Sequence, residues 1–316
     1  VRVRVSRGGP SPRAVRSPSG PTLGRAAADR QLASSVMPAD RSAPPHQPVA
    51  TVFDRRDETP RLWENPGGVY RRRIIVRRVD AQHVAGELED DYHHFRVDIR
   101  HDRGTVTEVE GAGLRGPWAT CHDAHEPLAE IIGLSLSSHP TVLAGVDARR
   151  NCTHLFDLTG LALTHAARGG APGDRRYDIA VTEPTGDDQF LEATLWCDGV
   201  ERLHWELRSG EIAAPEAWVG APLRTKFIPW ACERFAGDDD SAEAAIVLRR
   251  AIDISRGRQM DLDTFDSAEP LLSMMEGICY SMTAARVPVA IRQKGSARDF
   301  TDRPGLLLAD FDTRRA

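Results

Sequence analysis

Apolar runs are short throughout this 316-residue chain. None approaches the roughly 18 residues needed to cross a bilayer, and no apolar segment near the N-terminus could form the core of a secretory signal. These absences argue against a membrane-spanning or secreted protein. The sequence therefore predicts a cytoplasmic protein without a membrane partner.

Cysteine and lysine are also scarce. The cysteines are odd in number and spread along the chain, which is typical of reduced thiols rather than a disulfide framework. They are Cys121, Cys152, Cys197, Cys232 and Cys279. Lysine occurs only at Lys226 and Lys294, so arginine carries nearly all the positive charge, a bias that we attribute to a GC-rich genome.

Excess positive charge is missing as well. The formal net charge is -5, which supplies no general attraction to nucleic-acid phosphates. We therefore expect no nucleic-acid partner, and a small-molecule ligand is the partner that fits.

Several familiar site motifs are absent. The order of residues in "KGSARDF" is not that of a P-loop, and neither G-x-S-x-G nor H-E-x-x-H occurs. "DLDTFD" lacks the glycine and the final glutamate of a calcium loop. No nucleotide cofactor is expected, and common hydrolase classes are disfavoured.

Residues 1–60 form a leader rich in Pro, Ser and Arg, without an apolar face, and are predicted to be disordered. A transit peptide or a basic arm is one interpretation of this composition. The favoured interpretation is an upstream translated segment, with Met37 as the true start.

The fold class predicted for residues 61–312 is α+β, as a single domain. Period-two alternation predicts strands at "YRRRIIVRRV", "YHHFRVDIRH", "TVTEVEG", "RRYDIAVTE", "FLEATLWC" and "VERLHWELR". Asp198-Gly199 is a hairpin turn signal. Helical periodicity predicts helices at 121–133, 152–167, 227–236 and 241–255. The order suggests two similar halves, 70–168 and 175–304, each an antiparallel meander followed by a pair of helices, and one interpretation is an internal duplication.

Four segments carry a family resemblance. "RGPWATCHDA", "NCTHLFDLTGLALTHAAR", "AIDISRGRQMDLD" and "KGSARDFTDRP" together resemble a bacterial family known as domain of unknown function 2889, over about Tyr70 to Pro304. The resemblance implies that this region is one evolutionary unit. It implies no reaction, cofactor or partner.

Two helix starts carry the candidate chemistry. With Asn151 as N-cap, Cys152 is the first helical residue and His154 the third. A capping box formed by Thr120 and Asp123 places Cys121 at the first position of a second helix, with His122 directly after it. A helix N-terminus and a nearby imidazolium favour the thiolate, so Cys121, Cys152, His122 and His154 are candidate catalytic residues.

Three interpretations of these residues stay open. They could form a catalytic Cys/His site, or Cys121, Cys152, His154 and one of His122 or His125 could bind zinc. Because no C-x2-C knuckle is present, zinc is not favoured. The third is structural, with buried cysteines and a core histidine.

Arginines supply the candidate substrate contacts. In "YHHFRVDIRH", alternation places His93 and Phe95 on one face and Arg96 on the other, where Arg96 could face a polar cleft or solvent. Arg115 is a second candidate for orienting an anionic group. Arg298 is a third, although an internal ion pair or turn is its more ordinary role.

Two functions therefore remain. The favoured one is a small-molecule enzyme that uses acid–base or thiol chemistry without a bound nucleotide, and the alternative is a noncatalytic ligand-binding or scaffold protein. Residues two apart on a helix do not face one another, which favours His154 over Cys152. We expect His154 to contact Cys121, His122 or Arg115 beside a concave pocket.

Overall fold

A computed structural model describes residues 67–170 and 172–315 of the chain. The leader predicted at 1–60 lies outside the described residues, and the single-domain assignment of 61–312 stays a prediction. Within the described ranges, no helix has the length and apolar character needed to cross a membrane.

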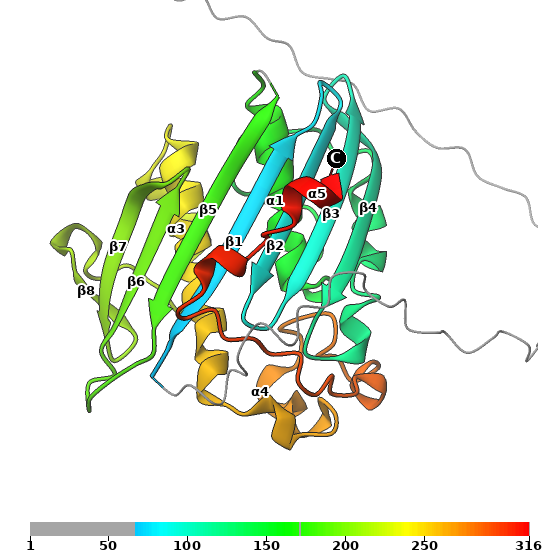
Figure 1. Cartoon of the computed structure of the whole chain (residues 1–316). Helices are drawn as coiled ribbons and strands as arrows, with labels where there is room; N and C mark the ends of the chain where they lie inside the picture. The colour runs from blue at the N-terminus through cyan, green and yellow to red at the C-terminus, as the bar shows by residue number, and fades with distance from the viewer. Residues whose placement is uncertain (1–66, 171, 316) are drawn as a thin grey trace, which may run out of the picture. The chain divides into compact units, whose positions relative to one another are not determined.

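An antiparallel sheet of eight strands forms the frame, in the order β4-β3-β2-β1-β5-β6-β7-β8 (Figure 1). The strands are β1 (Val69–Arg78), β2 (His83–Asp90), β3 (His94–Asp102), β4 (Thr105–Arg115), β5 (Gly173–Thr182), β6 (Leu191–Cys197), β7 (Val200–Arg208) and β8 (Glu211–Ala214). Two four-stranded meanders thus meet where β1 pairs with β5. With the helices described next, this confirms the predicted α+β class.

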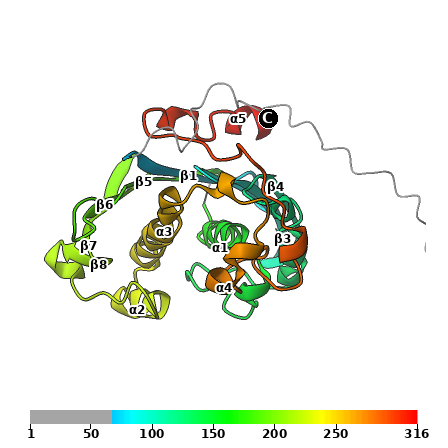
Figure 2. The same cartoon turned by 90° about the horizontal axis from the view of Figure 1, so that it is seen from below.

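Helices lie on both faces of the sheet (Figure 2). They are α1 (Thr153–Ala167), α2 (Phe227–Arg234), α3 (Asp239–Ser255), α4 (Leu272–Met275) and α5 (Phe311–Arg315). α1 packs on β1, β2 and β3, while α3 packs on β5, β6 and β7. Figure 2 shows α1 and α3 side by side under the sheet and α5 on the opposite face.

The sequence of β1 explains how both faces are covered. Alternate residues from Tyr70 to Arg78 are buried on the helix face. On the other face, Arg73 donates to the carbonyl of Leu307 at 2.6 Å, and Arg77 pairs with Asp312 at 2.6 Å. Arginine therefore anchors the C-terminal segment across the sheet.

The helix predicted at 121–133 was wrong. The structure has two short 3-10 helices there, Ala119–Cys121 and Glu126–Ile131. Pro127 lacks an amide hydrogen and cannot continue an α-helix. The first meander is consequently followed by one α-helix instead of a pair, and Thr120 donates to Ser281 rather than capping a helix.

Other predicted elements agree with the structure to within a few residues. α1 begins one residue later than expected, with Cys152 rather than Asn151 at the N-cap position. The strand at 105–111 extends to Arg115, and neither β2 nor β8 was predicted. The internal duplication is not decided by these elements and stays a prediction.

The Asp198-Gly199 hairpin is confirmed between β6 and β7. Both turn residues have positive φ, 53° and 82°, as a type I′ turn requires. Leu195, Trp205 and Leu207 are fully buried, whereas Leu203, next to a register shift, is half-buried.

Gly199→Val should lower the free energy of unfolding by about 1–2 kcal/mol, because a β-branched residue is strained at positive φ. Urea denaturation measures this change. Gly199→Asn is the control, since asparagine tolerates the left-handed region and should cost less. Equal losses in both variants would show that the turn does not depend on this backbone conformation.

Candidate functional site

The centre of the candidate site is the turn between β2 and β3. β2 ends at Asp90 and β3 begins at His94. Oδ1 of Asp90 accepts hydrogen bonds from the backbone amides of Tyr92 and His93, both at 2.8 Å. A short side chain that bonds to the backbone two residues onward is a common way to close a turn. This turn brings His93 beside Asp90.

Asp90 is fully buried and held from both sides. Its Oδ2 accepts from the Tyr70 hydroxyl at 2.8 Å and from Nη2 and Nε of Arg72 at 2.6 and 3.1 Å. Burial opposes ionisation, but His93 and Arg72 together hold the pKa of Asp90 well below its ordinary value. Asp90 is therefore a carboxylate in the folded protein.

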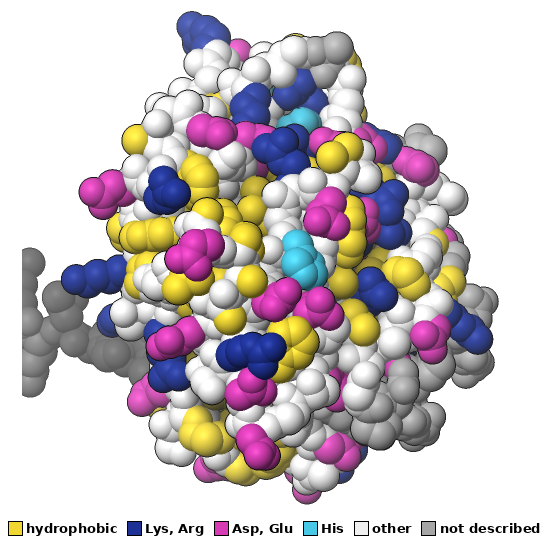
Figure 3. All heavy atoms as spheres, turned by 90° about the vertical axis from the view of Figure 1, so that its left-hand side faces the viewer, with side chains coloured by type: hydrophobic (Ala, Val, Ile, Leu, Met, Phe, Trp, Pro, Cys, Tyr) yellow, Lys and Arg dark blue, Asp and Glu magenta, His cyan; other side chains and the backbone are white. Residues whose placement is uncertain are grey.

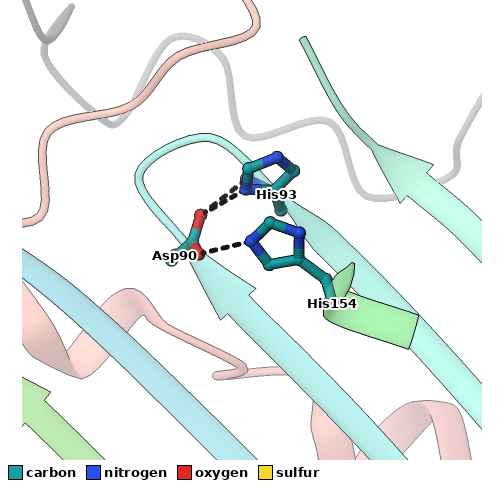
Figure 4. A group of neighbouring side chains, drawn as sticks. All are labelled: Asp90, His93 and His154. Carbon is teal, nitrogen blue, oxygen red and sulfur yellow. Dashed lines mark hydrogen bonds and ion pairs between the residues drawn. The ribbon is translucent and has the colours of Figure 1, made fainter. Parts of the chain in front are cut away.

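The imidazole rings of His93 and His154 stack on one another beside this carboxylate (Figure 4). Nδ1 of His93 lies 3.0 Å from Oδ1 of Asp90, and Nε2 of His154, from the first turn of α1, lies 3.8 Å from Oδ2. The ring centroids are 3.7 Å apart. Burial lowers the pKa of His93, and burial and His93 lower the pKa of His154 well below its ordinary value. Both rings are therefore neutral near pH 7.

Asp90, His93 and His154 are close enough to be considered as metal ligands, because one ligand atom from each lies within 4.8 Å of the others. Three features oppose a cation. Each Asp90 oxygen already accepts three hydrogen bonds, and Arg72 supplies a positive charge at the same carboxylate. The two rings are stacked at 29°, so their nitrogen lone pairs run side by side rather than converging on one point. The geometry fits a hydrogen-bonded cluster better than a metal centre.

Arg115 holds the turn that carries this cluster. Its guanidinium donates to the carbonyls of Asp90, Asp91, His93 and Ser296, at 2.6 to 3.3 Å, and pairs with Glu89. These acceptors engage both terminal nitrogens. Arg115 therefore positions the turn, and the substrate contact predicted for it stays a prediction.

The thiols are buried and not activated. Burial raises the pKa of Cys121 to about 12. Burial also raises the pKa of Cys152 well above its ordinary value, outweighing the first-turn amides of α1 that face its sulfur. Since the thiolate is the reactive form, this environment favours the structural interpretation of both cysteines.

The other predicted site residues lie apart from the cluster. His122 is exposed and hydrogen-bonds the carbonyl of Gly113 at 2.7 Å. Arg96 is exposed on the face of β3 opposite Phe95. Arg298 is buried and donates to the carbonyls of Gly295 and Ala297 in its own loop. The site roles of the three residues stay predictions.

His154 lies in the histidine cluster, and its site role stays a prediction. The ring and charge interactions that the structure shows for it are with His93, Asp90 and Phe95. The expected contact with Cys121, His122 or Arg115 is not among them. Alternation along "YHHFRVDIRH" predicts that His93 and Phe95 share a face. No pattern in the sequence shows that the turn between β2 and β3 meets the start of α1.

A cavity of about 370 Å³ lies between α1 and α3, over β1. Its walls are mainly apolar, from Phe156, Leu161, Ile228, Ile246 and Val247 among others. Charged side chains also line it: Arg72, Asp157, Glu243 and Arg250. Arg72 is shared, because the same side chain binds Asp90 of the histidine cluster.

Two of these charged groups are satisfied within the protein. Glu243 accepts from Thr164 at 2.7 Å, from both terminal nitrogens of Arg168 at 3.0 Å, and from Tyr177. Arg72 is bound to Asp90. By contrast, the described part of the chain provides no hydrogen bond to the side chain of Asp157 or Arg250, which form an ion pair at 3.3 Å. The open hydrogen-bonding capacity of the cavity is therefore concentrated at this pair.

The outer surface beyond β8 has a different character. Figure 3 shows acidic, basic and apolar side chains interspersed there, so the described residues on this face form no surface of a single charge. The cavity between α1 and α3 is the more selective place for a ligand.

Comparison with known proteins gives one family match, over part of the chain. Residues 75–168 match the model of a family described as "Protein of unknown function (DUF2889)". The match includes Cys152 to Leu155, while the segment from Gly295 to Thr301, which also carried the resemblance, lies beyond it. A search of curated proteins found no match.

The environment of His154 predicts that stability depends on pH. Because its folded pKa is lowered well below 6.5, the unfolded chain takes up a proton that the folded protein resists as the pH falls below 6.5. The contribution of neutral His154 to stability is complete above pH 6.5. It is lost as the pH falls toward the pKa of His154 in the folded protein. We expect urea unfolding between about pH 7 and 5.5 to show a decline, with up to about 1.4 kcal/mol per pH unit due to His154.

His154→Gln should flatten this decline, whereas the exposed His122→Gln should leave it unchanged. If both variants kept the slope of the unmodified protein, His154 would not be buried as a neutral imidazole.

Proposed function

We propose that this protein, assigned to the DUF2889 family by its residues 75–168, binds a small and mainly apolar molecule in the cavity between α1 and α3. The observation that carries the proposal is the cavity itself, about 370 Å³ in volume, with apolar walls and a few charged groups. Small-molecule sites commonly combine an apolar enclosure with a small number of polar contacts.

The position of the cavity supports a binding role. α1 follows the first meander and α3 the second, and each packs on three strands of its own half. The cavity thus lies where the two halves meet over the sheet. We infer that the halves 70–168 and 175–304 arose by duplication, and the mirrored strand order about the β1–β5 pair supports this.

Gly160 gives a direct test of occupancy. It lies in α1, lines the cavity, and a Cβ built on it has Leu143 Cδ1 as its nearest neighbour, at 3.7 Å. Gly160→Leu should therefore fill the cavity without backbone strain. We expect the variant to lose about tenfold or more in affinity for the neutral fluorescent probe N-phenyl-1-naphthylamine, with an unfolding temperature no lower than before, since leucine favours helix.

Gly145→Leu is the matched control, because Gly145 does not line the cavity and a Cβ there meets nothing within 4 Å. It should bind the probe as the unmodified protein does. Undiminished binding by Gly160→Leu, or no binding by the unmodified protein, would contradict the proposal.

A second candidate is an enzyme that uses acid–base chemistry at the Asp90–His93 pair. Asp90 accepts from Nδ1 of His93, which fixes the ring tautomer and leaves Nε2 as the basic nitrogen. The side chain of His93 keeps 12% of its surface exposed. His93 does not line the cavity, so binding is the stronger proposal. Thiol chemistry has less support, since Cys121 and Cys152 are both buried.

The enzyme candidate predicts a reaction that depends on His93. Purified protein would be incubated with a mixture of cell metabolites and the consumed compounds followed by mass spectrometry. His93→Asn should abolish consumption but leave probe binding intact, while His122→Gln should retain both. Identical consumption profiles for the unmodified protein and His93→Asn would remove this candidate.

A further inference from the structure

We propose that the ligand carries a carboxylate, which binds at the Asp157–Arg250 ion pair while its apolar part fills the cavity. This inference rests on the proposed binding function and adds the chemical class of the ligand. It depends on what the two side chains lack inside the protein.

Arg250 is the anchor of this site. It lies on α3, lines the cavity and makes no hydrogen bond to a described residue; its buried Nε lies 3.3 Å from Oδ2 of Asp157, as an ion pair without hydrogen-bond geometry. A guanidinium has five N–H donors in a planar fork that matches the two oxygens of a carboxylate. The side chain of Arg250 is 25% exposed, so water reaches it, and a ligand carboxylate would replace that water with charge-assisted hydrogen bonds.

Asp157 lies on α1 across from Arg250. Its carboxylate is 24% exposed, but Asp157 lines the cavity, and burial still raises its pKa. Two carboxylates would repel one another. Because the pKa of Asp157 is raised, less free energy is needed to protonate Asp157, and the proton can then be shared with the carboxylate of the ligand. The pair can therefore accept an acid, with Arg250 donating to one oxygen and protonated Asp157 donating to the other.

The neighbouring charges do not compete for this role. Arg72 is bound to Asp90, Arg249 to Asp253 at 2.8 Å, and Glu243 to Arg168. Arg250 is thus the cavity arginine with a free donor set among these residues. Beside it, Phe156, Ile246 and Val247 offer contact to a hydrocarbon chain.

The test compares three probes with the same eight-carbon chain: octanoate, 1-octanol and octylamine. With full-length protein and isothermal titration calorimetry, octanoate should bind about tenfold or more tightly than 1-octanol, because charge-assisted hydrogen bonds to Arg250 are lost in the alcohol. Octylamine should bind most weakly.

Variants then assign the preference to Arg250. Arg250→Met, which keeps an apolar stem, should lose the preference for octanoate and leave 1-octanol affinity within about twofold. Asp157→Asn should retain the preference, because the amide still donates to an acid oxygen. Arg256→Met, an exposed arginine on the same segment, is the matched control and should bind all three probes as before.

Each other outcome overturns a separate claim. Equal binding of octanoate and 1-octanol would contradict the carboxylate while leaving the cavity as a binding site. Tightest binding of octylamine would make Asp157 the anchor and the ligand a cation. If no probe bound, the proposed binding function would itself fail. Should Arg250→Met not fold, the ranking of the probes on the unmodified protein still decides the inference.

Discussion

The buried carboxylate of Asp90 is the interaction on which the centre of this structure depends. It closes the β2–β3 turn through two backbone amides and fixes Tyr70 and Arg72 of the adjacent strand. A carboxylate without water is stable only when charge and hydrogen bonds replace its hydration. Arg72 supplies the charge, and its own burial is tolerable for the same reason. Neither side chain would be stable there alone.

Arg72 also joins two regions that the strand order keeps separate. It contacts the turn carrying His93 through Asp90, and it lines the cavity between α1 and α3. A ligand that changes the field around Arg72 would therefore act on the histidine cluster through a single buried ion pair. The cavity and the histidine cluster are therefore separate places that share one side chain, Arg72.

Arginine has three separate uses in the described structure. Arg72 neutralises a buried carboxylate, Arg115 binds the carbonyls of the β2–β3 turn, and Arg73 and Arg77 fasten the C-terminal segment to the outer face of β1. The guanidinium suits all three because it stays charged when buried and donates in several directions. The compositional bias toward arginine thus has structural consequences that composition alone did not reveal.

Local pattern determined much of the fold. Alternation in β1, β3 and β7 located strands, and Asp198-Gly199 specified its hairpin, because side-chain period and turn stereochemistry depend on neighbouring residues alone. The same reasoning failed at 121–133, where Pro127 overrode helical periodicity. It placed His154 and Cys152 at the start of α1 and His93 inward beside Phe95. It could not bring His93 to His154, or Asp157 to Arg250, because these pairs form only when distant segments pack on one sheet. The tertiary structure alone decided that Asp90, rather than a cysteine, is the partner of both histidines.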